Sequence, residues 1–99
     1  MRLKQGSKWG RISPEIILAV MVACDVFKDY GYELVLTEGT GGGHMEGSLH
    51  YFGQAVDIRT RHVIEDKWRP MVNDIRSRLT TDYDVVLEPD HLHIEYDPK

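Results

Sequence analysis

The sequence contains a single cysteine, Cys24, and no long apolar run. One thiol cannot close an intrachain disulfide, and a structural zinc finger built on several cysteines is excluded. The longest apolar run, residues 16–24, is far shorter than the ~20 residues that span a bilayer. Because no small-residue cleavage site follows this run, we expect no signal peptide, synthesis in the cytoplasm and no insertion into a membrane.

Positive charge is also scarce. The chain has 12 Lys and Arg residues against 16 Asp and Glu residues, which gives a net charge of -4. This balance argues against nucleic acid as a partner, because phosphate backbones attract basic surfaces. With 41% hydrophobic and 28% charged residues, the 99 residues have the composition of one modest globular domain, 1–99. The composition does not predict an oligomeric state.

Two helices are expected. The first covers residues 14–29, because Ser13 can cap its beginning and Gly31 can end it. The second covers roughly residues 66–79, where apolar residues recur at helical spacing. Pro70 requires this second helix to begin late, since proline is tolerated only in the first turn.

Segments rich in β-forming residues predict four strands, at residues 32–37, 54–59, 83–87 and 92–96. Residues 1–12 are polar and basic, and they predict either a loose N-terminal arm or a first docking segment. The pattern as a whole predicts an α+β fold, in which a small antiparallel sheet of about four strands packs on two or three helices.

Groups that bind metals are concentrated in two short segments. Residues 48–57 contain one imidazole and one carboxylate, His50 and Asp57. Residues 90–93 contain two further imidazoles and a carboxylate, which can supply the third ligand and a group for proton transfer. A catalytic zinc requires three nitrogen or oxygen ligands and one open position, since the open position holds the attacking water. The two segments together therefore predict a metal site, with Asp57 on the outward face of its strand.

Strand alternation places further polar groups near this site. In the last strand His91, His93 and Glu95 share one face. A lone histidine is more often a satisfied surface or core residue than a ligand. His44 and His62 lie in no comparable pattern, and we expect them to be solvent-exposed.

The pattern Ser-x-His-x-x-Gly-x-Ala-x-Asp, followed late in the chain by His-x-His, resembles the LAS metallopeptidases of the M15 type. The matching positions are Ser48, His50, Gly53, Ala55 and Asp57, followed by His91 and His93. That group includes D-Ala-D-Ala carboxypeptidases and dipeptidases, L-alanyl-D-glutamate endolysins and the hedgehog signalling domain. The resemblance covers roughly residues 32–96 and implies a hedgehog- or D-Ala-D-Ala-peptidase-like fold. Gly53 and Ala55 are small residues that would let the backbone and a metal come close.

The resemblance also implies roles for individual residues. The ligands of one zinc ion per chain would be His50, Asp57 and His93. The general base of the family lies three positions before the last ligand, which is Asp90 here, and Glu88 is the alternative. His91 would assist by hydrogen-bonding the developing oxyanion or the substrate.

The substrate side departs from the family pattern at one point. Ser48 would donate a hydrogen bond to the substrate, as the resemblance implies. Many members carry an arginine upstream of the first motif, whereas residues 37–47 contain none. Arg59 or Arg61 would have to take its place in binding substrate.

These expectations lead to a function. We expect a zinc peptidase of the small phage type that hydrolyses a peptide bond in the stem peptides of bacterial peptidoglycan, as an endolysin-like endopeptidase. It would act on the cell wall after release from the cell or as part of a virion. The alternatives are a D-Ala-D-Ala-type carboxypeptidase and a non-catalytic zinc-binding module of the hedgehog-like kind.

Overall fold

The chain folds into five strands, two α-helices and one short 3-10 turn, as the computed structural model of residues 1–39 and 53–98 describes them. The strands are β1 (Arg2–Leu3), β2 (Val35–Glu38), β3 (Ala55–Arg59), β4 (Tyr83–Leu87) and β5 (His91–Tyr96). The helices are α1 (Pro14–Asp29) and α2 (Trp68–Arg78), and the 3-10 turn η1 (Glu65–Lys67) directly precedes α2. The predicted α+β class is confirmed.

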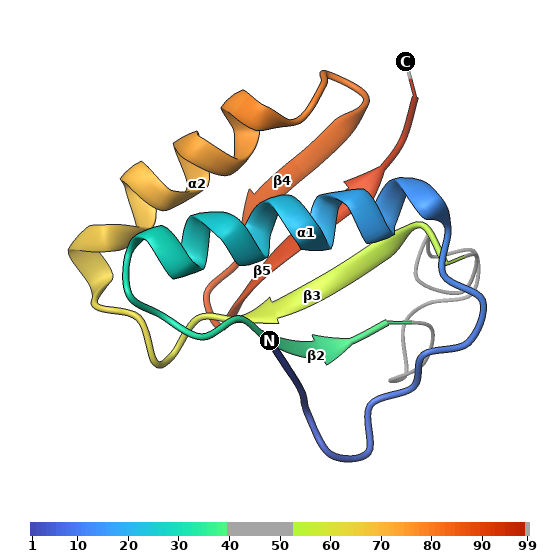
Figure 1. The fold of residues 1–99 in the computed structure, drawn as a ribbon, viewed down its shortest axis with the longest axis horizontal. Coiled ribbons are helices and arrows are strands. Elements are labelled where there is room, and N and C mark those ends of the chain that lie inside the picture. The colour runs from blue at the N-terminus through green and yellow to red at the C-terminus, as the bar shows by residue number, and fades with distance from the viewer. Residues whose placement is uncertain (40–52, 99) are drawn as a thin grey trace.

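All five strands belong to one sheet, with the order β1-β2-β3-β5-β4 (Figure 1). The pairs β2–β3, β3–β5 and β4–β5 are antiparallel, whereas β1 and β2 run parallel. The expected antiparallel sheet of about four strands is therefore a mixed sheet of five. The difference arises from β1, which is too short to leave a periodic signal in the sequence.

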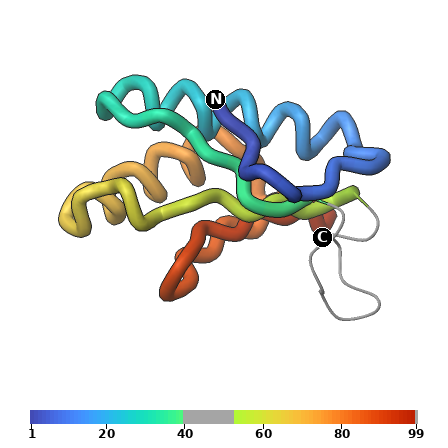
Figure 2. Tube along the Cα trace, turned by 90° about the horizontal axis from the view of Figure 1, so that it is seen from below, coloured from blue at the N-terminus to red at the C-terminus, as the bar shows by residue number. Residues whose placement is uncertain are grey.

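Both α-helices lie on the same side of the sheet (Figures 1 and 2). On β3 and β5 the residues on that side are fully buried at 0% exposure, and they are Val56, Ile58, Leu92 and Ile94. Burial of one such side chain stabilises the fold by about 1.5–3 kcal/mol. The helices therefore fix β3 and β5 in place and leave the opposite face of these strands for other groups.

Both helices begin and end for local reasons. The Oγ of Ser13 accepts a hydrogen bond from the backbone N–H of Ile16 at 3.2 Å, and Gly31 takes the left-handed conformation with φ +83° after the last turn of α1. In α2 the proline at position 70 is the third helical residue, so it removes no hydrogen bond within the helix. The predicted first helix and the late start of the second are confirmed. Among the described residues, no helix is both long and apolar enough to cross a bilayer.

The N-terminal segment, residues 1–12, is a docking segment. The backbone N–H groups of Arg2 and Lys4 donate to carbonyl oxygens of the chain around β2, each at 2.8 Å. Further along, the N–H of Ser13 donates to the carbonyl of Gly53 at 3.0 Å. Gly53 has φ +72°, and a Cβ at this position would overlap the carbonyl oxygen of Arg11. The structure thus gives the glycine of the first motif a role in docking this segment.

Candidate metal centre

The candidate site lies on the face of the sheet that the helices leave open. Asp57 on β3 pairs directly with His93 on β5, and Arg59 pairs with His91. Directly opposed residues of an antiparallel pair point to the same face, with their Cβ atoms about 4.5–5.5 Å apart. The expected alternation is confirmed on both strands, because the intervening residues are the fully buried apolar ones.

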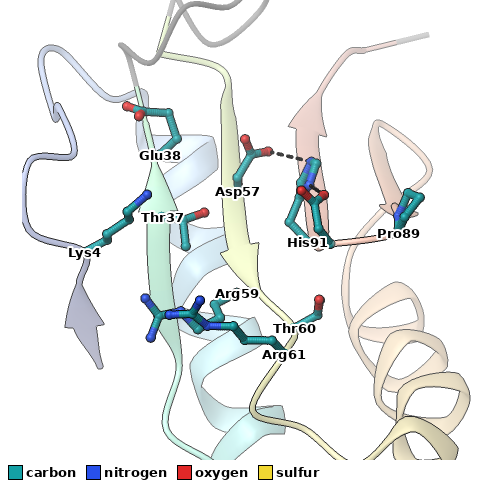
Figure 3. A pocket seen from close by; sticks show the side chains of 10 residues that line it. Lys4, Thr37, Glu38, Asp57, Arg59, Thr60, Arg61, Pro89 and His91 are labelled. Carbon is teal, nitrogen blue, oxygen red and sulfur yellow. Dashed lines mark hydrogen bonds and ion pairs between the residues drawn. The ribbon is translucent and has the colours of Figure 1, made fainter.

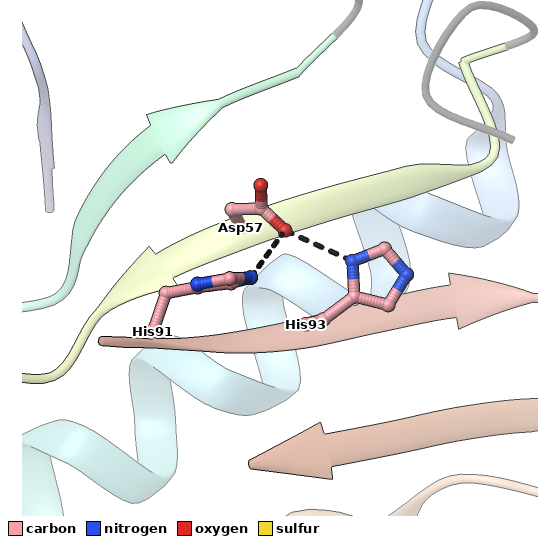
Figure 4. A group of neighbouring side chains, drawn as sticks. All are labelled: Asp57, His91 and His93. Carbon is pink, nitrogen blue, oxygen red and sulfur yellow. Dashed lines mark hydrogen bonds and ion pairs between the residues drawn. The ribbon is translucent and has the colours of Figure 1, made fainter. Parts of the chain in front are cut away.

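One carboxylate oxygen joins the two histidines (Figure 4). The Oδ1 atom of Asp57 lies 2.9 Å from Nδ1 of His93 and 3.6 Å from Nε2 of His91. Ligands at about 2.0–2.1 Å from a tetrahedral zinc are separated from each other by about 3.3 Å. The three atoms lie within 4.8 Å of one another. With their nitrogen and oxygen donors, these three side chains could hold a metal ion.

His93 is held from both sides. Its Nδ1 faces Asp57 at 2.9 Å, and its Nε2 faces Oε1 of Glu95 at 2.8 Å. Carboxylate oxygens only accept hydrogen bonds, so this arrangement favours the form of His93 in which both ring nitrogens carry a proton. The hydrogen bond to Asp57 raises the pKa of His93 above its ordinary value, and that to Glu95 adds to it, while burial acts in the opposite direction. A cation bound at Nδ1 would replace one proton, and the N–H at Nε2 would stay with Glu95.

This second contact is typical of metal-binding histidines. Such a residue usually donates its other ring N–H to a carboxylate or a carbonyl, which fixes the orientation of the ring. Glu95 occupies that place for His93. The side chain of Asp57 is 10% exposed and that of His93 18%, so both are also held by the surrounding protein.

Asp90 lies at the edge of the site. Its Oδ1 is 2.6 Å from Nδ1 of His91, and its side chain is 88% exposed. Together these contacts form a chain in which carboxylates and imidazoles alternate, in the order Asp90, His91, Asp57, His93 and Glu95. Glu88, the alternative base, lines a neighbouring cavity together with Trp68 and Leu87.

A cavity of about 660 Å³ opens beside the site (Figure 3). Asp57, Asp90 and His91 form one part of its wall. Another part carries three cationic side chains, those of Lys4, Arg59 and Arg61. Arg59, expected to contact substrate, therefore lines the cavity into which the candidate site opens.

The structure brings together Asp57, His91 and His93, of which the first and third are predicted ligands. The predicted ligand His50 and the predicted substrate contact Ser48 lie outside the described residues, as does His44. His62 is exposed as expected, and its Nε2 lies 2.7 Å from a backbone carbonyl.

Two residues lie at the site although the sequence analysis did not assign them to it. Glu95 was expected on the same strand face as His93, and this spacing was the signal for its contact with the imidazole ring. Lys4 had no such signal, because only the docking of the N-terminal segment brings it to the cavity.

A scan against protein-family models finds no match to this chain, and no curated protein is significantly similar to it. The resemblance to the M15-type peptidases therefore remains a prediction from the two motifs. The cluster of Asp57, His91 and His93 is a possible metal site in its own right.

Proposed function

We propose that this protein is a zinc-dependent peptidase that hydrolyses a peptide bond in the stem peptides of bacterial peptidoglycan, as an endopeptidase. The observation that carries the proposal is the convergence of Asp57, His91 and His93 beside a cavity of about 660 Å³. The motif spacing in the sequence supports the same chemistry independently.

The nitrogen and oxygen donors suit zinc. Asp57 and His93 would bind it, with His50 as the third ligand. When bound, zinc supplies Lewis acidity for a peptide carbonyl and lowers the pKa of a water molecule. Asp57 contributes the negative charge that the cation requires, and Glu95 keeps the His93 ring in the orientation for binding.

Asp90 transfers the proton, and His91 stabilises the oxyanion. Asp90 acts as the general base that takes a proton from the attacking water and passes it to the departing amine. His91 donates Nδ1–H to Asp90, from which it lies 2.6 Å away. Its Nε2 lies 3.6 Å from Oδ1 of Asp57, and in the imidazolium form, in which both ring nitrogens carry a proton, it donates a hydrogen bond to the oxyanion that develops on the substrate.

The test is a digest of purified peptidoglycan by the zinc-loaded protein, with the products identified by mass spectrometry. We expect new peptide termini that disappear with a chelator and with Asp90→Ala. The matched control is Glu88→Ala, because Glu88 lies two residues away and lines the neighbouring cavity. Activity that is lost in Glu88→Ala and kept in Asp90→Ala would transfer the role of base to Glu88.

The same experiment separates the peptidase from the non-catalytic alternative. A protein that holds about one zinc per chain and cleaves no bond would be a zinc-binding module of the hedgehog-like kind. The exposed position of Asp90, at 88% of its side chain, is the observation that keeps this alternative in view. The position of the new termini distinguishes endopeptidase from carboxypeptidase action.

A further inference from the structure

Helix α1 carries more apolar side chains than its contacts with the rest of the fold bury. The residues on its inner side are fully buried, and they are Ile16, Ala19, Ala23, Val26 and Phe27. On the outer side Ile17 and Leu18 are each 51% exposed, and Met21 is 61% exposed. Exposed apolar residues are common singly, whereas a contiguous group of them marks an interaction surface.

A cavity of about 370 Å³ lies beside the outer side of α1. Ile17 and Met21 form part of its wall. Met1 and Leu3, which are 65% and 50% exposed, form another part. We call these four residues and Leu18 the α1 patch. Of the eight large apolar side chains that are exposed in the described part of the chain, five belong to this patch, so the exposed apolar surface is concentrated in one place.

The α1 patch lies away from the candidate metal centre. Helix α1 covers one face of the sheet, whereas Asp57, His91 and His93 lie on the other face (Figures 1, 2 and 4). A partner on the patch would leave the cavity beside Asp57 open. The patch therefore indicates a second role, separate from the proposed chemistry.

Charges of both signs flank the α1 patch. Residues 1–12 contain four exposed cations and no carboxylate. Helix α1 contains three carboxylates and a single lysine, and Asp25 is exposed one turn beyond Met21. Such a surface is complementary to another copy of itself, because the basic segment of one copy can lie against the acidic helix of the other. An anionic membrane fits less well, since the chain has a net charge of -4.

We propose that the α1 patch joins two copies of this chain, with their α1 helices antiparallel about a twofold axis. The contact is then isologous, so that the same residues of both copies meet. The protruding side chains of one α1 pack against the cavity beside the other α1. With the axis close to Leu18, Arg11 of one copy comes beside Asp25 of the other, because these residues lie seven positions before and after Leu18.

The surface is large enough for such a dimer. A standard interface buries about 800 Å² on each partner, which is about an eighth of the accessible surface of 6090 Å². Residues 1–12 and α1 together make up more than a quarter of the chain. The patch supplies the apolar core of the interface, and the charges around it supply the polar rim.

The strand β1 lies at one edge of the sheet, and its charges disfavour pairing with the β1 of a second copy. The exposed Arg2 and the following Lys4 would lie beside the same cations of that copy. Like charges that face each other across two strands are destabilising, and cations on an edge strand oppose its pairing. The two copies are therefore joined through their helices and not through a continuous sheet.

The experiment is sedimentation velocity of the full chain at concentrations from about 1 µM to about 1 mM, the range of moderate and weak dimers. We expect a monomer–dimer equilibrium. Met21→Asp should raise the Kd of the dimer at least about a hundredfold, since the substitution enters a symmetric contact twice. Ile64→Asp is the matched control and should leave the Kd unchanged, because Ile64 is 63% exposed and lies outside the patch. Circular dichroism checks that both variants are folded.

Further variants test the antiparallel arrangement. In a chain that carries Cys24→Ser, Leu18→Cys should form a disulfide-linked dimer under mild oxidation. Ile64→Cys in the same chain should not, because only position 18 lies near the axis. Arg11→Glu and Asp25→Arg should each raise the Kd about tenfold, and the chain with both substitutions should regain most of the affinity.

A chain that is monomeric at all these concentrations would overturn the proposal, as would equal Kd values for Met21→Asp and Ile64→Asp. Equal crosslinking of the two cysteine variants would contradict the axis near Leu18. Binding of the monomer to vesicles of phosphatidylglycerol, lost in Met21→Asp, would assign the patch to a lipid surface instead. These outcomes leave the proposed peptidase untouched, since its site lies on the other face of the sheet.

Discussion

The two faces of the β3–β5 strand pair carry opposite chemistry on the same ten or so residues of backbone. One face presents Val56, Ile58, Leu92 and Ile94, all fully buried beneath the helices. The other face presents the alternating carboxylates and imidazoles of the candidate site, with Arg59 beside them. Because side chains alternate along a strand, neighbouring residues have different roles: Ile94 packs in the core and Glu95 contacts the candidate site.

This difference separates stability from chemistry within one structural unit. The apolar face supplies the burial that holds the two strands in register. That register in turn sets Asp57 opposite His93. A shift by one residue would turn the imidazoles toward the helices and the apolar side chains toward solvent. The positions of the candidate ligands therefore depend on the residues that face away from them.

The largest expected effect is on the apolar face. Ile94→Ala removes a fully buried side chain, and we expect it to lower the free energy of unfolding by about 2–5 kcal/mol. The matched variant Glu95→Ala changes the neighbouring residue on the other face. It should lower the free energy of unfolding by only about 1 kcal/mol, which corresponds to one lost hydrogen bond. Urea denaturation of the metal-free protein measures both. Equal losses would show that the two faces do not divide these roles.

The next largest effect is expected from a substitution on the polar face. Asp57→Asn keeps the size of the side chain and removes its charge. We expect the affinity for zinc to fall about a hundredfold or more. The binding free energy of a structural zinc is about 10–16 kcal/mol for four ligands, so one ligand accounts for several kcal/mol. Competition with a chromophoric chelator measures the loss. Asp66→Asn in η1 is the control, because it removes an equal charge from an exposed residue that belongs to neither group of possible metal ligands among the described residues. Zinc affinity that is unchanged in Asp57→Asn would contradict the metal site.

A smaller effect tests the support of His93. Glu95→Ala removes the acceptor at Nε2, and we expect zinc affinity to fall about 10- to 100-fold. Glu95→Gln should retain most of the affinity, because its amide oxygen still accepts the hydrogen bond. If both variants lose the same affinity, Glu95 acts through its charge and not through the orientation of the ring.

The smallest effect concerns protonation. In the metal-free protein the hydrogen bond to Asp57 raises the pKa of His93, so its protonated form is favoured by folding. The resulting stability is fully present below the ordinary histidine pKa of 6.5 and is lost as the pH rises through the raised pKa. We therefore expect His93→Gln to be more costly at about pH 6 than at about pH 9. Urea denaturation in the presence of a chelator measures the difference, and the opposite order would contradict it.

Most of the local structure could be predicted from the sequence. Helix α1 was predicted with its observed bounds, because Ser13 and Gly31 act within a few residues of its ends. The strand β4 was also predicted as observed, and β5 begins one residue earlier than expected. The strand β1 could not be predicted, since its two residues are paired with a segment some thirty residues away.

The candidate site divides in the same way. Asp57 and His93 were predicted as ligands, and the structure sets them side by side. His91 was expected to act on the substrate, and its Nε2 lies close enough to Asp57 to join the same cluster. Lys4 could not be predicted, because nothing near it in the sequence relates it to the cavity.

The sequence by itself determined which residues alternate on β3 and β5, because the two-residue period of a strand is a property of the local backbone. It thereby determined that Asp57, His91 and His93 would share polar faces. Only the tertiary structure decided that β3 and β5 are neighbours, with Asp57 opposite His93, and that Lys4 reaches the same cavity. These relations depend on hydrogen bonds and packing between segments far apart in the chain, which no local pattern contains.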